Sequence, residues 1–428
     1  MKIGLYLQDY RKNSIKEFEE KIVAARKAKL DLFVFPETGY TPYIDEFYCT
    51  DIESETDREI IEQAAIEISQ KLNCAVIIGA DDSYGMIYNI YANAFAKEGE
   101  TKIKYYYKHT MADDSPLAFE NYSDIVDYQF EPILLKGKKI GMTICYDCNH
   151  SAFSRAYGKN NVDVIINSTG GNVVYKKWYK YNKVRAIENN CINLCTMGYQ
   201  ENKRANSYTF GFTPSGKLMS CKPLFSVNDD WDRIGNIFIY DTEYEDGFEK
   251  DIDIDQKQTR NDKGDFKISV DIINEIITNA EIIQKDLYIS NISGINLVFC
   301  ILNEKDIIKP EIVLKKLYNP ELKKYDKKKY IILNRWVSPV SKQYYENVLS
   351  DILKVRAMEN FCAVILDSPK KVMCYQCGDN RTSQVVEGID GKYILDTGRM
   401  GGPETIWKNK LGMKAAWRIG FETLVKSL

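Results

Sequence analysis

Four residues that could carry out acyl transfer stand at or near the ends of apolar runs in this sequence. Cys145 closes the run at residues 139–144, and Glu37 comes two residues after another apolar run. Lys108 follows a tyrosine-rich segment, and Glu120 lies in the stretch after it. In α/β proteins, functional side chains gather where the strands of a sheet end. We therefore expect these four side chains to converge on one site.

The residue types suit nucleophilic attack on a carbonyl carbon. A cysteine attacks as its thiolate, and a nearby ammonium such as that of Lys108 lowers the pKa of the thiol. Glu37 can accept the thiol proton, give it to a leaving amine and then activate water. Lys108 and the backbone N–H of Tyr146 can stabilise the oxyanion, at about 3–4 kcal/mol per donor. Glu120 can hold the lysine charged and oriented.

The sequence also allows other interpretations of these residues. Glu131 competes with Glu120 for the second carboxylate, because it lies in the same interval after Lys108. Cys145 could be a buried core cysteine, or the first member of a Cys-x-x-Cys pair with Cys148. A redox pair would require the first cysteine to open a helix within a β-α-β unit. Zinc binding would require this pair together with a second Cys-x-x-Cys pair far along the chain.

Several motifs, in matching order and spacing, carry a resemblance to one family: Pro36-Glu37, Tyr107-Lys108, Ile144-Cys-Tyr-Asp147, Trp178 before Arg185-Ala-Ile-Glu-Asn189, and the turn from Gly211 to Gly216. On these motifs, residues 1–240 resemble the nitrilase superfamily of carbon–nitrogen hydrolases. The resemblance implies a four-layer α-β-β-α sandwich and a catalytic triad of Glu37, Lys108 and Cys145. It also implies an assisting glutamate, for which we choose Glu120, and no metal or organic cofactor.

The segments that would shape a substrate pocket differ from the family pattern. Residues 148–153 lack its aromatic-Pro-Glu run, and the loop after Glu37 is short. His150 falls near a histidine that is seen in some carbamoyl-amide hydrolases. We predict that four residues near the triad line the pocket, namely Tyr43, His150, Asn172 and Trp178.

Alternating strand and helix patterns would position these residues. Strands are predicted where apolar runs occur, at residues 2–8, 31–35, 74–79, 139–144 and 162–167, with a β-hairpin joining 90–96 to 101–107. Capping-box spacing predicts helix starts at Ser14-Ile-Lys-Glu17 and Thr56-Asp-Arg-Glu59. This alternation favours a layered α/β domain.

A seven-residue repeat links two distant parts of the chain. Lys-Val-Arg-Ala-Ile-Glu-Asn at residues 183–189 recurs at residues 354–360 with one conservative difference. Each copy follows an apolar run that ends in asparagine, Asn167 in the first case and Asn334 in the second. Arg and Glu stand three residues apart in each copy, so both predicted helices are expected to carry an ion pair. This order favours an internal duplication over coincidence between two similar helices.

The length of 428 residues and the repeat predict two domains. We expect a catalytic domain at residues 1–240, an acidic connector at 241–265, and a degenerate nitrilase-like domain without the triad at 266–428. The last is expected to be a smaller α/β unit that packs on the first as an intrachain pseudo-dimer, with further homo-oligomers as an option. The alternative is an unrelated α/β appendage.

Composition argues against several function classes. The net charge of −3, from 58 basic and 61 acidic residues, gives no electrostatic case for binding nucleic acid. No apolar run is long enough for a membrane span, and the N-terminal stretch does not predict a signal peptide. Eleven cysteines without an export signal favour the reducing cytoplasm. Only two histidines occur, which excludes a multi-histidine metal site.

The predicted function is hydrolysis of a non-peptide C–N bond in a small linear amide or carbamoyl compound. The reaction would pass through a thioester on Cys145 and release ammonia or an amine. The alternatives are an acyl- or amidotransferase that uses the same residues, a nitrile hydrolase, and a binding protein without activity. The sequence has no Gly-rich phosphate loop of the kind an ATP-dependent synthetase needs. All three triad residue types are present, which argues against a binding protein.

Overall fold

A computed structural model of the chain consists of two compact units, Met1–Lys250 and Asp251–Leu428. It describes residues 1–11, 15–39, 54–81, 87–110, 130–170, 175–200, 208–229, 231–243, 267–369, 371–377, 383–385, 393–402 and 414–428. The predicted connector at residues 241–265 lies outside these ranges from residue 244 onwards. The predicted domain limits therefore stay a prediction.

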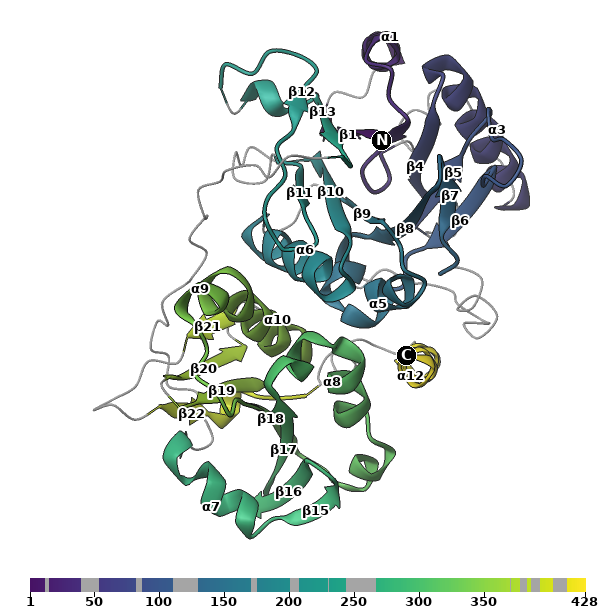
Figure 1. The fold of residues 1–428 in the computed structure, drawn as a ribbon. Helices are drawn as coiled ribbons and strands as arrows, with labels where there is room; N and C mark the ends of the chain where they lie inside the picture. Colours follow the sequence, from purple (N-terminus) through teal and green to yellow (C-terminus); the bar gives the residue numbers. More distant parts are fainter. Residues whose placement is uncertain are drawn as a thin grey trace. The chain divides into compact units, whose positions relative to one another are not determined.

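The first unit contains two sheets (Figure 1). The strands of the first sheet are β1 (Lys2–Tyr6), β3 (Leu32–Val34), β4 (Ala75–Asp81), β5 (Ile87–Ala92), β6 (Ile103–Tyr107), β12 (Lys222–Pro223) and β13 (Ile237–Asp241). The strands of the second sheet are β2 (Gln8–Asp9), β7 (Ile133–Leu135), β8 (Lys138–Ile144), β9 (Val164–Thr169), β10 (Ile192–Tyr199) and β11 (Phe210–Phe212). Their orders are β12-β13-β1-β3-β4-β5-β6 and β11-β10-β9-β8-β7, and β2 pairs with β10. The predicted strands and hairpin are present, except that residues 2–8 form two strands in different sheets.

Helices cover the outer face of each sheet. The helices α1 (Ile15–Lys27) and α3 (Ser54–Leu72) lie on the first sheet, where α3 contacts β4 and β5. The helices α5 (Ser151–Lys159) and α6 (Tyr175–Asn189) lie on the second sheet, where α6 contacts β10 and β11. The two sheets contact each other through β1 with β10 and β5 with β8. The predicted four-layer α-β-β-α sandwich is therefore confirmed.

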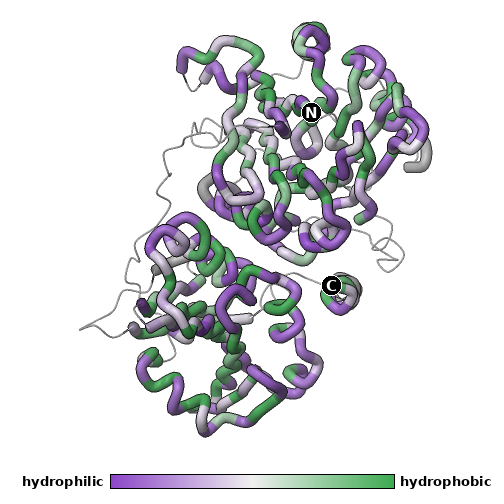
Figure 2. The backbone as a smooth tube through the Cα atoms, viewed as in Figure 1, coloured by the Kyte–Doolittle hydropathy of each residue, from purple (hydrophilic) through white to green (hydrophobic). Residues whose placement is uncertain are grey.

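The central strands of the second sheet are buried on both faces. Strands β8, β9 and β10 run parallel, and every residue of β9 and β10 is buried. Parallel strands between two layers of structure need apolar side chains on both faces, which explains their continuous apolar runs. Figure 2 shows hydrophobic residues along the strands of both units.

Buried polar contacts join the two sheets. The Thr196 hydroxyl on β10 donates to the backbone carbonyl of Tyr6 on β1, at 2.8 Å. The Asn89 amide on β5 donates to the Ser168 hydroxyl on β9 at 3.2 Å, and that hydroxyl donates to the carbonyl of Phe35 at 3.1 Å. These directional bonds fix how one sheet lies over the other, which packing of apolar side chains alone does not do.

The second unit is a smaller α/β unit with its own sheet. Its strands are β15 (Glu281–Gln284), β16 (Leu287–Ile292), β17 (Ile295–Asn303), β18 (Lys328–Arg335), β19 (Ala363–Ser368), β20 (Lys371–Cys377) and β21 (Ser383–Val385), in that spatial order, and β14 (Lys267–Ser269) pairs separately with β22 (Ile394–Asp396). The helices are α7 (Ile273–Thr278), α8 (Pro310–Leu317), α9 (Lys342–Tyr344), α10 (Ser350–Asn360) and α12 (Lys414–Ser427). Strands β17, β18 and β19 are parallel.

The repeated heptapeptides lie on α6 and α10, and both predicted ion pairs form. Arg185 and Glu188 are 2.6 Å apart, and Arg356 and Glu359 are 2.5 Å apart, with all four side chains buried. The predicted intrachain pseudo-dimer stays a prediction. Among the helices in the described ranges, none is both long and apolar enough to cross a bilayer.

We predict that Thr196→Val destabilises the first unit by about 1 kcal/mol, because it removes a buried hydrogen bond between the sheets while keeping the side-chain shape. Thr196→Ser keeps the hydroxyl and serves as the control. The measurement is the free energy of unfolding in urea. Equal stability of the wild type and Thr196→Val would show that this bond does not hold the sheets together.

Candidate active site

Cys145 lies at a sharp turn where β8 ends. Its φ of +46° is in the left-handed region, which a residue other than glycine enters at a cost of about 1–3 kcal/mol. Cys145 opens the 3₁₀ helix η1 (Cys145–Asn149), α5 follows, and the chain returns along the parallel strand β9. Such a strained strand-to-helix turn exposes a nucleophile beyond the end of its strand. We call this turn the Cys145 elbow.

The carboxylate of Asp147 holds the elbow in place. It accepts hydrogen bonds from the Ile144 N–H at 3.2 Å and the Tyr106 hydroxyl at 2.9 Å. It also accepts from the His109 N–H at 3.1 Å and the Thr110 hydroxyl at 2.6 Å. The last three donors belong to β6 and the residues just after it. Asp147 therefore ties the elbow to the segment that carries Lys108.

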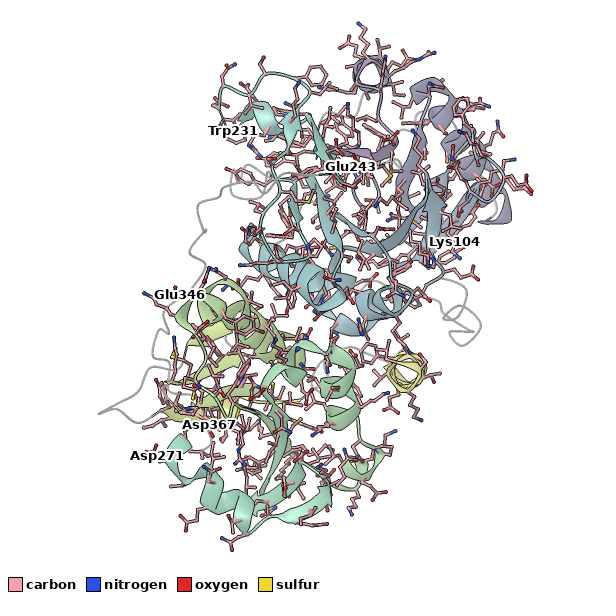
Figure 3. The ribbon with its side chains drawn as sticks, in the orientation of Figure 1. Lys104, Trp231, Glu243, Asp271, Glu346 and Asp367 are labelled. Atoms are coloured by element: carbon pink, nitrogen blue, oxygen red, sulfur yellow. The ribbon has the colours of Figure 1, made fainter. Side chains whose placement is uncertain are left out.

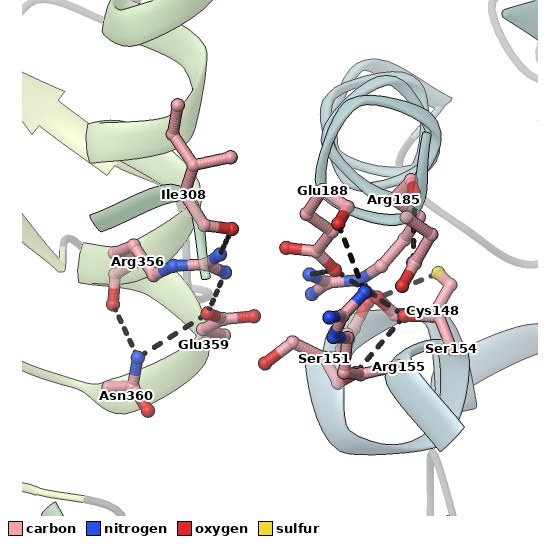
Figure 4. A network of polar contacts seen from close by, with 12 residues as sticks. Cys148, Ser151, Ser154, Arg155, Arg185, Glu188, Ile308, Arg356, Glu359 and Asn360 are labelled. Carbon is pink, nitrogen blue, oxygen red and sulfur yellow. Dashed lines mark hydrogen bonds and ion pairs between the residues drawn. The ribbon is translucent and has the colours of Figure 1, made fainter. Parts of the chain in front are cut away.

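Two further side chains hold the backbone of the elbow. The amide of Asn167 on β9 donates to the Cys145 carbonyl at 3.4 Å. Arg185 on α6 donates to the Cys148 carbonyl at 2.8 Å, while Glu188 pairs with its guanidinium (Figure 4). The geometry of a 3₁₀ turn leaves carbonyls at its end without helical partners, and Arg185 satisfies one of them. The ion pair on α6 thus also supports the elbow.

Glu37 is placed by a tight packing of backbone against backbone. A Cβ atom on Gly79 of β4 would lie 2.2 Å from the Pro36 carbonyl oxygen, so only glycine permits this approach. The Tyr10 hydroxyl donates to the Glu37 carbonyl. The Gly170 N–H, just beyond β9, donates to Glu37 Oε2 at 2.8 Å. One carboxylate oxygen is therefore held by the second sheet.

The other carboxylate oxygen of Glu37 meets Lys108. Lys108 Nζ lies 2.5 Å from Glu37 Oε1, and the Cys145 thiol is hydrogen-bonded to the same carboxylate. The residues Glu37, Lys108 and Cys145 are 6%, 4% and 4% exposed. The structure thus brings together the three residues of the predicted triad in one buried cluster. Their catalytic roles stay predictions.

Burial and charge set the protonation of the cluster. Burial, together with the charge of Glu37, raises the pKa of the Cys145 thiol well above its ordinary value, and Lys108 lowers it only in part. Burial lowers the pKa of Lys108, but the interactions with its neighbours, of which the one with Glu37 comes first, outweigh burial and raise it. The resting site therefore holds a neutral thiol, a charged lysine and a carboxylate hydrogen-bonded to both. This arrangement suits proton transfer from the thiol to Glu37 during attack.

The two candidates for the second carboxylate are Glu120 and Glu131. Glu120 lies outside the described residues. Its competitor Glu131 forms an ion pair with Lys104 at 3.3 Å, and its side chain is 69% exposed. The structure therefore does not support Glu131 as a member of the buried cluster. The assisting role of Glu120 stays a prediction.

Three of the predicted oxyanion and pocket residues form one aromatic group around Tyr146, the residue that follows Cys145. The ring of Tyr146 is 6.2 Å from that of His150 and 5.9 Å from that of Trp178. The ammonium of the buried Lys177 lies 5.5 Å from the Tyr146 ring. Two other predicted pocket residues, Tyr43 and Asn172, lie outside the described residues. The ring of the other histidine, at position 109, lies nearly parallel to the rings of Phe130 and Phe153, with centroids 5.4 and 4.9 Å away.

The structure meets the geometric condition for a redox pair of Cys145 and Cys148 but not the electrostatic condition. Cys145 does open a helical segment between two parallel strands, and both Cys145 and Cys148 are free thiols. A redox pair needs a first cysteine with a lowered pKa, whereas burial raises the pKa of Cys145. The cluster therefore favours activation of the thiol by a neighbouring base.

The sequence did not predict three groups that position Cys145 or Glu37. They are the side chains of Asp147 and Tyr10 and the Gly170 N–H. Asp147 is part of the motif that begins at Ile144, so the motif itself was a signal that could have identified it. Tyr10 and Gly170 had no such signal, because each acts on Glu37 across a large separation in sequence.

Comparison with known proteins gives one family model and a set of similar solved structures. Residues 10–219 match the family model described as Carbon-nitrogen hydrolase. Solved structures that resemble this chain include an amidase from Nesterenkonia sp., at 14% identity and a TM-score of 0.41, covering 56% of this chain and 89% of that protein. A carbon-nitrogen hydrolase from Helicobacter pylori G27 has 16% identity and a TM-score of 0.41, covering 56% and 88%. No curated protein matches the chain.

We predict a pH-dependent effect of Asp147→Asn. Burial raises the pKa of Asp147 from 3.8 to about 7, although its hydrogen bonds and Lys108 act against this. Between these pH values the native state keeps a proton that the unfolded chain has lost, so the contribution of Asp147 to stability falls as the pH rises, and the loss is complete above about 7. The variant carries no titrating group at this position.

The expected result in urea unfolding is that Asp147→Asn is less stable than the wild type throughout, because its NH₂ group faces hydrogen-bond donors. The difference in the free energy of unfolding between the wild type and Asp147→Asn should become smaller from pH 4 to pH 7. Asp163→Asn, which changes a partly exposed carboxylate on the same sheet, is the control. A difference that does not change with pH would contradict the shifted pKa.

Proposed function

We propose, from the match of residues 10–219 to the carbon–nitrogen hydrolase family model, that the chain hydrolyses a small linear amide or carbamoyl compound through a thioester on Cys145. The observation that carries the proposal is the buried contact between Lys108 and Glu37 beside the Cys145 thiol. This contact brings an ammonium group and a carboxylate together in the buried cluster that holds the thiol, and these groups suit the proposed roles of nucleophile, proton acceptor and oxyanion partner.

The first half of the reaction forms the thioester. Glu37 takes the thiol proton as Cys145 Sγ bonds to the carbonyl carbon, and the carbonyl π electrons move onto oxygen. Lys108 Nζ and the Tyr146 N–H stabilise this oxyanion, since preorganised donors act most strongly in a buried site. The tetrahedral intermediate then collapses, the C–N bond breaks, and Glu37 gives its proton to the departing nitrogen. Ammonia or an amine leaves.

The second half releases the acid. Glu37 takes a proton from water as the water oxygen attacks the thioester carbon, and the C–S bond breaks. The proton then returns to the Cys145 sulfur, which restores the neutral thiol. The hydrogen bond from the Gly170 N–H supports this double use of Glu37, because it fixes the carboxylate while leaving its other oxygen for the lysine and the thiol.

The substrate is proposed to be small. Tyr146, His150 and Trp178 would form an aromatic wall beside the thiol, and Tyr43 and Asn172 are proposed to complete the pocket. Glu120 is proposed to orient Lys108. The free thiols at Cys145 and Cys148 are compatible with the proposed cytoplasmic location, where such pairs stay reduced.

We predict that Cys145→Ala and Cys145→Ser lower kcat for ammonia release from a panel of small linear amides by at least about a thousandfold, because the first removes the nucleophile and the second replaces the thiol by a less acidic hydroxyl. The matched control is Cys148→Ser, which changes another buried thiol in the same 3₁₀ helix and should retain activity within about threefold. Turnover that survives in the Cys145 variants would refute the thioester route.

The fate of the acyl group separates hydrolysis from transfer. With a small amide and hydroxylamine present, a hydrolase is expected to give mainly carboxylic acid, and the hydroxamic acid should rise in proportion to hydroxylamine as it competes with water. The measurement is the ratio of the two products at increasing hydroxylamine. Hydroxamic acid as the main product, with no acid formed when hydroxylamine is absent, would instead indicate a transferase.

A further inference from the structure

The second unit repeats the Cys145 elbow with a glutamate in place of the cysteine. Strand β17 ends at Asn303, and Glu304, with a φ of +41°, opens the 3₁₀ helix η5 (Glu304–Ile308). Helix α8 follows, and the chain returns along β18, parallel to β17. Apart from an additional 3₁₀ helix, η6 (Pro320–Lys324), before β18, the order of elements and the left-handed residue match β8, Cys145, η1, α5 and β9. We call this turn the Glu304 elbow.

The side chains that hold the two elbows also correspond. Asn334 on β18 donates to the Glu304 carbonyl at 2.8 Å, as Asn167 does to Cys145. Arg356 on α10 donates to the carbonyl three residues after Glu304, at 3.0 Å, as Arg185 does three residues after Cys145. Figure 4 shows each arginine with its glutamate.

The pairing of β8 with β9 and of β17 with β18 also corresponds. Asn167 pairs with Thr143, two residues before Cys145, and Asn334 pairs with Leu302, two residues before Glu304. Two residues after each asparagine, a side chain donates to its Oδ1 atom: Thr169 at 2.6 Å and Trp336 at 2.7 Å. Trp336 therefore takes the place of Thr169 at the end of its strand.

A cavity of about 590 Å³ opens at the Glu304 elbow. The residues of its wall that matter here come from η5 and from the ends of two parallel strands, β18 and β19: Glu304, Lys305, Asp306, Arg335, Trp336 and Asp367. Asp367 lies on β19 (Figure 3). A cavity at this end of a parallel sheet is where α/β proteins bind small molecules.

The cavity holds charges of both signs that are not neutralised by direct pairing. The side chains of Glu304, Asp367 and Lys305 form no hydrogen bond or ion pair with another described residue, and Arg335 donates only to the neutral Asn274 amide oxygen, at 2.5 Å. Asp306 differs, because it forms an ion pair with Lys309 at 3.5 Å, and we do not assign it to the ligand. Two carboxylates and two cations are therefore available to a bound molecule.

Trp336 supplies a fixed apolar surface between these charges. Its indole N–H is bonded to Asn334, and its ring lies 6.0 Å from that of Tyr344. An indole held in this way loses little freedom when a ligand binds, and its face attracts both apolar groups and ammonium ions. In the described residues, no group of three His, Cys, Asp or Glu side chains could hold a metal ion. An organic ligand is therefore the better match.

We infer that this cavity binds a small zwitterion, an α-amino acid, with its ammonium group toward Glu304 and Asp367, its carboxylate toward Arg335 and its side chain against Trp336. A ligand with one charge would pair only with the two carboxylates or only with the two cations of the cavity. The elbow places Glu304 for binding as the first unit places its thiol, and binding at this site forms no covalent bond. The site does not use Cys145.

The test is isothermal titration of the full chain with L-leucine and with two analogues that each lack one charge, 3-methylbutylamine and 4-methylpentanoate. Saturable binding of one leucine per chain is expected, at least tenfold tighter than binding of either analogue. Glu304→Gln and Asp367→Asn should each weaken leucine binding at least fivefold. Glu321→Gln, an exposed carboxylate outside the cavity, is the matched control, and thermal unfolding checks that each variant is folded.

Three outcomes would overturn the inference. One is the absence of saturable binding at millimolar leucine, and another is equal binding of leucine and either analogue. The third is leucine binding that is unchanged in both Glu304→Gln and Asp367→Asn but lost in Cys145→Ala, which would assign the binding to the first unit. If one variant fails to fold, the other decides, because Glu304 and Asp367 lie on different elements.

Discussion

The structure of the candidate site depends on one buried carboxylate, that of Asp147. Its donors come from the Cys145 elbow and from the end of β6, which belong to different sheets. An apolar interface between sheets tolerates sliding, whereas a carboxylate with four donors fixes distance and direction. Asp147 therefore determines where Lys108 lies relative to Cys145. Glu37 is placed in a similar way, by the Gly170 N–H across the same interface.

Much of this arrangement could be predicted from the sequence, because it depends on strand ends. Apolar runs mark buried parallel strands, and polar residues directly after them must gather at one edge of a sheet. That reasoning identifies Glu37, Lys108 and Cys145, and the structure brings them together. The repeated Arg and Glu, three apart on two helices, likewise predict two ion pairs that form.

The rest depends on contacts that a single sequence does not encode locally. The sequence does not distinguish Glu131 from Glu120 as the second carboxylate, whereas the ion pair of Glu131 with Lys104 argues against Glu131. Tyr10 donates to the backbone carbonyl of Glu37, and the Gly170 N–H donates to the Glu37 carboxylate, so both roles depend on contacts between residues far apart along the chain. Glu304 shares no motif with Cys145, and only its left-handed φ and the matching bonds from Asn334 and Arg356 relate the two elbows. The two elbows therefore correspond in backbone conformation and in the side chains that hold them, but not in the residue at the turn.

The most direct test of the central claim is rapid-quench mass spectrometry of the enzyme during turnover of a small amide. The account predicts a transient mass increase equal to the acyl group, located by proteolysis on the peptide that contains Cys145. The Glu37→Gln variant should accumulate little of it, because the proton acceptor is missing. Steady product formation with no adduct, or an adduct on a different residue, would contradict the account.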